Sequence, residues 1–120
     1  YSKKIFDALA PTNVPRIHFG TGTATLLELM KEAGGSVIGI DWRVPLDQAS
    51  QRLGAIALQG NLDPAVMLTS PEIIEKHARE ILTQMNGRRG HIFNLGHGIL
   101  PNTPIENVER LVEVIHNWNM

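Results

Sequence analysis

The segment with the most evident chemical potential is NLGHGILP at positions 94 to 101, which places His97 between Gly96 and Gly98. An apolar stretch gives way to a loop here, and parallel α/β proteins keep their functional groups at this kind of point. Glycine on both sides removes the flanking side chains, so a ligand can approach the imidazole and the backbone closely. The same residues also suit a tight turn with a solvent-facing histidine, and both interpretations stay open from this motif alone.

Polar residues follow the other apolar stretches in the same way. In chain order they are Thr21, then Asp41 with Arg43, then Gln59 with Asn61, and finally Asn94 with His97. The carboxyl ends of parallel strands meet at one edge of a sheet, so these side chains form a candidate site lining. Structural alternatives remain, because Asp41 can pair with Arg43, Asn61 suits a turn, and Phe19 and Trp42 suit a core.

Short apolar runs alternate with longer amphipathic runs along the whole chain, which predicts repeated βα units and a parallel sheet. The runs are apolar throughout, so we expect both faces of the sheet to be covered. Four such units make either a small open doubly wound sheet or half of an eight-stranded barrel, and periodicity does not choose between them. The expected strands are 16–19, 37–40, 55–58 and 91–95, and the expected helices are 2–9, 23–33, 46–53, 71–85 and one that begins near 104.

Two helix starts carry capping patterns. Ser70 precedes Pro71, which predicts an N-cap followed by proline at the first helical position. Thr103 and Glu106 have the spacing of a capping box for the last helix. On that helix the apolar spacing predicts an inward face made of Ile105, Val108, Leu111, Val112 and Ile115.

Composition excludes several classes of function. With 42% hydrophobic residues, the 120-residue chain has enough apolar material for a core. Its 11 basic and 12 acidic residues nearly balance, so charge predicts neither a nucleic-acid partner nor an anionic membrane partner. The chain has no cysteine, which excludes disulfides, thiolate nucleophiles and cysteine-based zinc sites, and its histidines lack metal-ligand spacing. No apolar run approaches the ~20 residues that span a bilayer.

Three linked motifs give a more specific interpretation. DWR at positions 41 to 43, QGNLDP at 59 to 64 and NLGHG at 94 to 98, in this order and at these separations, resemble the C-terminal part of uroporphyrinogen decarboxylases. The resemblance covers essentially the whole chain and implies a (β/α)8 barrel. Residues 1–120 are then expected to form a single partial domain, the C-terminal half of that barrel. The helical apolar pattern that starts directly after Tyr1 also leads us to expect a fragment.

The resemblance implies an activity and a role for individual residues. Members of the family remove the acetate carboxyl groups of uroporphyrinogen III, giving coproporphyrinogen III in haem synthesis, without a metal or organic cofactor. His97 is expected to donate to a substrate carboxylate, while Asp41, Arg43 and Asn61 are expected to support the floor of the site. Phe19 and Gly20 are expected to wall the cleft. The catalytic carboxylate, arginines and tyrosine belong to the other half of the barrel, so no catalytic residue is assigned here.

The expected parent protein is a cytoplasmic homodimer that binds a porphyrinogen but neither nucleic acid nor membrane. The isolated chain is expected to be inactive and to self-associate, because a half-barrel leaves open strand edges and an apolar inner face. Two alternatives stay open. A related cobalamin-dependent methyltransferase shares the fold but binds metal through cysteine and histidine, and a flavodoxin-like module could use the same strand ends to bind a small anion.

Overall fold

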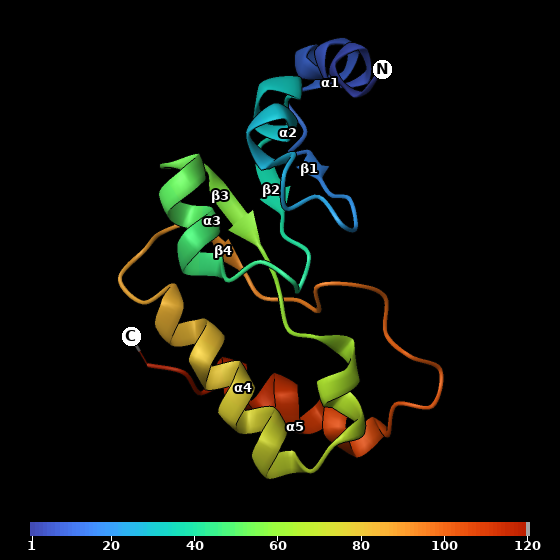
Figure 1. The fold of residues 1–120 in the computed structure, drawn as a ribbon, viewed down its shortest axis with the longest axis vertical. Coiled ribbons are helices and arrows are strands. Elements are labelled where there is room, and N and C mark those ends of the chain that lie inside the picture. The colour runs from blue at the N-terminus through green and yellow to red at the C-terminus, as the bar shows by residue number, and fades with distance from the viewer. Residues whose placement is uncertain (120) are drawn as a thin grey trace.

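A computed structural model describes residues 1–119 and shows one sheet of four parallel strands in the order β1-β2-β3-β4 (Figure 1). All three neighbouring pairs are parallel, so a crossover segment joins each strand to the next. The sheet confirms the predicted α/β class and the parallel arrangement. The strands are β1 Ile17–His18, β2 Val37–Gly39, β3 Ala57–Gln59 and β4 His91–Ile92.

Helices make up most of the crossovers and both ends of the described chain (Figure 1). The longest, α4 and α5, pack against one another in the lower half of that view. No helix among residues 1–119 is both long enough and apolar enough to cross a membrane. The α-helices are α1 Ser2–Leu9, α2 Leu27–Ala33, α3 Leu46–Leu53, α4 Pro71–Gln84 and α5 Ile105–His116, and the 3₁₀-helices are η1 Ala10–Thr12 and η2 Pro64–Leu68.

The core lies between the helices and one face of the sheet. Ile38 of β2 and Leu58 of β3 are partners in the strand register, and both are fully buried. They belong to one hydrophobic cluster with side chains from four α-helices and from η2, among them Leu27, Leu46 and Ile74. Because successive strand residues point to opposite faces, the helices cover the face that carries Ile38 and Leu58.

The opposite face of the sheet is less covered, contrary to the expectation from the apolar strands. Ile17 on β1 and Ile92 on β4 are exposed large hydrophobic residues on the two edge strands. The Cα radius of gyration is 15.0 Å, compared with about 13.6 Å for a compact domain of this length. The described chain is therefore an open sheet with one apolar face and both edges unpaired.

Most element boundaries lie within two residues of the sequence prediction, but strand β4 ends at Ile92 instead of residue 95, and the starts of two helices differ in detail. Helix α2 begins at Leu27 instead of residue 23, because residues 21–26 form turns in which Thr23 Oγ1 donates to Gly20 O at 2.8 Å. A threonine hydroxyl that binds nearby backbone competes with helix formation. The predicted capping box is wrong, because Thr103 Oγ1 donates to Leu100 O instead and Pro104 occupies the N-cap of α5.

The predicted buried face of α5 is only partly correct. Leu111 is buried, and Val108 and Ile115 pack partly buried against the core, but Ile105 and Val112 are 73% and 44% exposed. The helix turns the face with Asn107, Leu111 and Val114 inward, at spacings of four and three residues. Asn107 supports this orientation, since its Nδ2 donates to two backbone carbonyls in and just after η2, a helix that was not predicted from the sequence.

The N-cap of α4 is as predicted. The Ser70 side chain accepts a hydrogen bond from Ile73 N, and Pro71 is the first helical residue. Proline tolerates this position because its missing N–H has no partner within the helix. A correctly placed α4 matters for the site, because this helix forms one wall of the cavity described below.

Candidate functional site

Asp41 joins two of the loops that follow the strands. It lies directly beyond β2 with only 1% of its surface exposed. One carboxylate oxygen accepts from Gly22 N at 3.1 Å, in the loop after β1, and the other accepts from Arg43 N at 2.9 Å. Nη1 of Arg43 lies 2.9 and 2.8 Å from the two oxygens. The carboxylate therefore fixes the loop after β1 to the loop after β2.

The charge of Asp41 is maintained by its partners. Burial by itself raises the pKa of this carboxyl group, because it disfavours the charged form. The backbone N–H groups of Arg43 and Gly22, followed by the Arg43 guanidinium, together outweigh that effect and hold the pKa below its usual value of 3.8. The site thus has a buried, ionised carboxylate at neutral pH.

Asn61 connects the end of β3 to the same loop. Its side chain is buried, and its Nδ2 donates to Asp41 O at 3.0 Å and to Val44 O at 2.5 Å. Both acceptors are backbone carbonyls on either side of Trp42 and Arg43, so the amide clamps the turn that carries these two residues. The structure places Asn61 and Asp41 together, in positions where they can support a site.

The loop after β4 reaches the same place through Gly96. Its N–H donates to Leu62 O at 2.8 Å, beside a parallel bridge between Leu62 and Leu95. A Cβ atom on Gly96 would lie 2.6 Å from Trp42 Cβ and 2.7 Å from Trp42 Cα, so only glycine fits this approach. The DWR, QGNLDP and NLGHG motifs are therefore in contact at the carboxyl edge of the sheet.

His97 is exposed at this rim, one residue beyond the contact with Trp42. Its Nδ1 accepts a hydrogen bond from Gly98 N at 2.7 Å. A neutral imidazole with an accepting Nδ1 carries its proton on Nε2, so the other ring nitrogen is a donor. The ring therefore presents one N–H group to a ligand at the rim.

Phe19 and Gly20 lie at the end of β1 but line a different cavity. That cavity, of about 420 Å³, lies between the start of α1, β1 and α2. Phe19 is exposed and packs beside Gly39, where a side chain would approach the Phe19 ring to 2.9 Å. The structure thus does not bring these two residues into one cavity with Asn61, Arg43 or His97.

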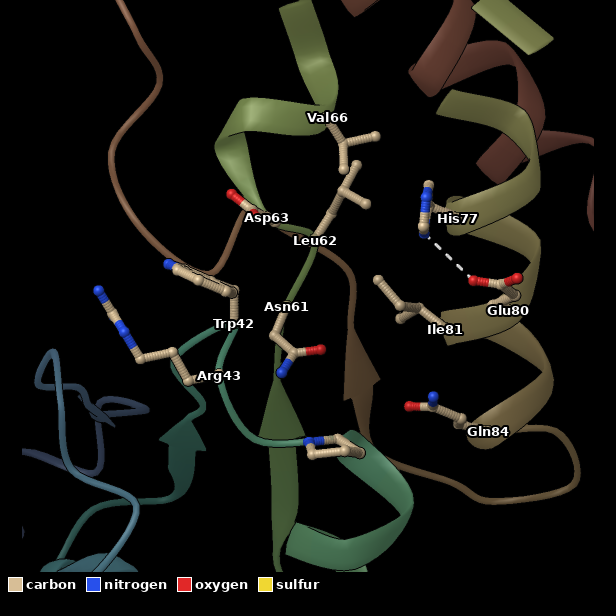
Figure 2. A pocket seen from close by; sticks show the side chains of 11 residues that line it. Trp42, Arg43, Asn61, Leu62, Asp63, Val66, His77, Glu80, Ile81 and Gln84 are labelled. Carbon is tan, nitrogen blue, oxygen red and sulfur yellow. Dashed lines mark ion pairs between the residues drawn. The ribbon is translucent and has the colours of Figure 1, made fainter. Parts of the chain in front are cut away.

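A second cavity, of about 280 Å³, adjoins the DWR loop. Figure 2 shows Trp42 and Arg43 on one side of it and three polar residues of α4 on the other side. Of the predicted site residues it includes Arg43 and Asn61, whereas His97 is not part of its lining. The lining residues that sequence analysis did not assign to a site are Trp42, Pro45, Leu62, Asp63, Val66, His77, Glu80, Ile81 and Gln84.

Helix α4 supplies the polar wall of this cavity. His77 Nδ1 lies 3.2 Å from Glu80 Oε2, and Gln84 lies one turn further along the same side (Figure 2). The i, i+3 and i+7 spacing of these residues is the sequence signal that indicates one shared helix face. Within residues 1–119 no three histidine, aspartate or glutamate side chains converge as a metal site would require.

Comparisons with known proteins identify one family. The sequence model of the family described as uroporphyrinogen decarboxylase matches residues 1–118. A uroporphyrinogen decarboxylase of Streptomyces coelicolor is 54% identical over 116 residues, which are 96% of this chain and 33% of that protein. The protein of the same name from Thermus thermophilus is 53% identical over 96% of this chain and 34% of its own length. The uroporphyrinogen decarboxylase of Geotalea daltonii is 48% identical over 97% of this chain and 34% of its own length.

The chain spans about a third of the length of these curated relatives. Within that third, the match runs through all four strands and through each of the three motifs that meet at the carboxyl edge of the sheet. On these grounds the chain belongs to the uroporphyrinogen decarboxylase family.

Proposed function

We propose that residues 1–120 are a partial domain of a uroporphyrinogen decarboxylase, to which they contribute four βα units of the barrel. The reaction removes the acetate carboxyl groups of uroporphyrinogen III and gives coproporphyrinogen III in tetrapyrrole synthesis. The observation that carries this proposal is the contact of the three family motifs at one edge of the sheet, through Asp41, Asn61 and Gly96. Relatives of that name at 48 to 54% identity favour it over a methyltransferase or a flavodoxin-like module.

The chemistry gives this chain a binding role. Protonation of a pyrrole carbon makes a cationic ring that accepts the electrons released as carbon dioxide leaves, so the substrate serves as its own electron sink. The protein must then hold the substrate carboxylates and stabilise the cation. His97 suits the first task, because its ring is exposed at the rim and keeps Nε2–H as a donor while Nδ1 accepts from Gly98 N. Asp41 and Asn61 hold the loops that place it, and the groups that stabilise the cation lie outside this chain.

The proposed setting is a cytoplasmic homodimer with no organic cofactor. The near balance of 11 basic and 12 acidic residues supports a small-molecule substrate over a nucleic-acid partner. Phe19 and Gly20 are proposed to wall the cleft from the β1 side, where the exposed Phe19 ring offers an apolar surface to a macrocycle.

Activity is best tested in a chimera, in which residues 1–118 replace the matching third of the Thermus thermophilus relative. We expect the chimera to convert uroporphyrinogen III. Replacement His97→Ala should raise KM about tenfold, because loss of one hydrogen bond to a carboxylate costs about 1.4 kcal/mol. Steady-state kinetics measures the change.

The matched control is His116→Ala, at the far end of α5, which should leave KM unchanged. A chimera that folds but does not turn over uroporphyrinogen III contradicts the proposed function. Unchanged KM in the His97→Ala chimera removes His97 from the site.

The isolated chain is proposed to self-associate through its open sheet. Sedimentation velocity of the 120-residue chain should show dimers or larger species that dissociate on dilution. Ile92→Lys should weaken this association at least tenfold, because it places a charge on an edge strand beside the exposed apolar face. Ile105→Lys is the matched control, since Ile105 is exposed on α5. Monomers at every concentration would rule out the proposed association.

A further inference from the structure

We propose that Arg43 is a substrate-binding residue that holds a second carboxylate of the porphyrinogen, beside the one held by His97. This inference deepens the proposed function and rests on it. From the sequence, Arg43 is expected only to support the floor of the site. The geometry of its guanidinium group points to direct contact instead.

Asp41 engages only one nitrogen of the guanidinium. Nη1 of Arg43 lies within hydrogen-bond distance of both carboxylate oxygens, and no other contact of the guanidinium with a hydrogen-bond partner is found among residues 1–119. A guanidinium has five N–H donors in a planar fork, so Nη2 and Nε keep donors that can bind a carboxylate. The Arg43 side chain is 52% exposed, although its partner is buried. The free donors are therefore accessible from the solvent.

The guanidinium is also held in place before any ligand arrives. Its central carbon lies 4.5 Å from the centre of the Trp42 ring, a stacking distance for a cation and an aromatic face. Asp41 fixes one end of the planar group while Trp42 fixes its tilt. An arginine held in this way loses less conformational entropy on binding a carboxylate than a free surface arginine does.

Asp41 does not use all the hydrogen-bond donors of Arg43. The same carboxylate accepts hydrogen bonds from two backbone N–H groups, of Gly22 and of Arg43 itself, so part of its acceptor capacity is already occupied. A group that only completed an ion pair would need no exposed donors. The arrangement instead resembles an anchored cation whose outer edge remains available for an anion.

The position of Arg43 matches the substrate proposed for the site. Gly96 packs on Trp42, so the loop that carries His97 adjoins the residue on which Arg43 stacks. In Figure 2 the Arg43 side chain points away from α4, on the same side as Trp42. Two donors on neighbouring loops of one rim suit a ligand that carries several carboxylates on a ring. We therefore assign Arg43 and His97 to different carboxylates of one macrocycle.

The test compares two substitutions of Arg43 in the chimera. Arg43→Lys keeps a cation for Asp41 but has no second terminal nitrogen, whereas Arg43→Met has neither. We expect Arg43→Lys to keep the melting temperature of the chimera while raising KM about fivefold, with kcat unchanged. Arg43→Met should lower the melting temperature and raise KM about tenfold or more. The matched control is Arg89→Met, just before β4 at the amino end of the sheet, which should leave KM unchanged.

An Arg43→Lys chimera with wild-type KM overturns the inference, because Arg43 then acts only as the partner of Asp41. Failure of the proposed function gives a different result, namely no turnover by the unmutated chimera. In that case the probe is uroporphyrin III, the oxidised macrocycle with the same carboxylates, followed by fluorescence titration. A several-fold weaker Kd in Arg43→Lys supports carboxylate binding by Arg43 even without turnover, and an equal Kd excludes it.

Discussion

Replacing Gly96 with alanine is expected to destabilise the 120-residue chain by about 3 kcal/mol and to abolish measurable turnover in the chimera. The added Cβ would lie 2.6 and 2.7 Å from Trp42 Cβ and Cα, which is closer than carbon atoms approach in folded proteins. Trp42 cannot move away easily, because Asn61 clamps the backbone on both sides of it. The loop after β4 must therefore shift, and it carries His97 with it.

Gly98→Ala is the matched control for this prediction. Gly98 flanks His97 on the other side, and a Cβ there meets no atom within 4 Å. Urea denaturation should show almost no change for Gly98→Ala and a marked decrease in the free energy of unfolding for Gly96→Ala. Equal stability and equal turnover for the two variants would contradict the close contact between the NLGHG and DWR motifs.

Replacing Asp41 with asparagine is expected to reduce stability by about 2 to 3 kcal/mol at pH 7. Asparagine has the same shape, but it offers one acceptor oxygen where the carboxylate offers two. Its amide N–H₂ group would face either Gly22 N–H or Arg43 N–H, so a donor would meet a donor. This loss of stability is smaller than the value for breaking a fully buried ion pair, because Arg43 is half exposed and its guanidinium can be hydrated when the pair is broken.

The Asp41 substitution should also change the response to acid. The pKa of this carboxyl group is lowered in the folded chain, so its contribution is complete above the unfolded value near 3.9 and is lost as the pH falls through the folded pKa. Unfolding measured from pH 7 to pH 2 should show a steeper loss for the unmutated chain than for Asp41→Asn. Asp47→Asn, at an exposed position on α3, is the control and should follow the unmutated curve. Parallel curves for Asp41→Asn and the unmutated chain would exclude a special role for this carboxylate.

The sequence predicts the strand and helix order because that information is local. Apolar runs such as Val37–Ile40 and the Ser70 cap of α4 are visible without knowledge of the fold, and the structure contains both features. Which side of a helix is buried depends on distant partners. Val108, Leu111 and Ile115 of α5 pack on the core as their spacing predicts, but Ile105 and Val112 are exposed. Asn107 is buried instead, where it binds carbonyls about 40 residues earlier in the chain. No local pattern predicts such a contact.

In the candidate site too, local sequence predicts some features, and contacts between distant segments determine the others. Asp41, Asn61 and His97 are predicted as residues that follow strands, because parallel strands bring their carboxyl ends to one edge. The packing of Gly96 on Trp42 is not visible in the sequence, since it depends on how closely the loop after β4 approaches the loop after β2. The polar wall formed by His77 and Glu80 is missed because these residues lie on a helix between two strands, where spacing indicates a face but not its neighbour.

The order of the four strands has a consequence for how the chain acquires its structure. Each strand pairs with the strand before it in the sequence, so every pairing within residues 1–119 can form as soon as the later strand is synthesised. During synthesis from the amino end, each new strand can therefore pair with the edge strand that is already formed. No strand has to insert later between two others. Vectorial growth of this kind favours early partial order, while the edge that receives the next strand stays unpaired until that strand is synthesised.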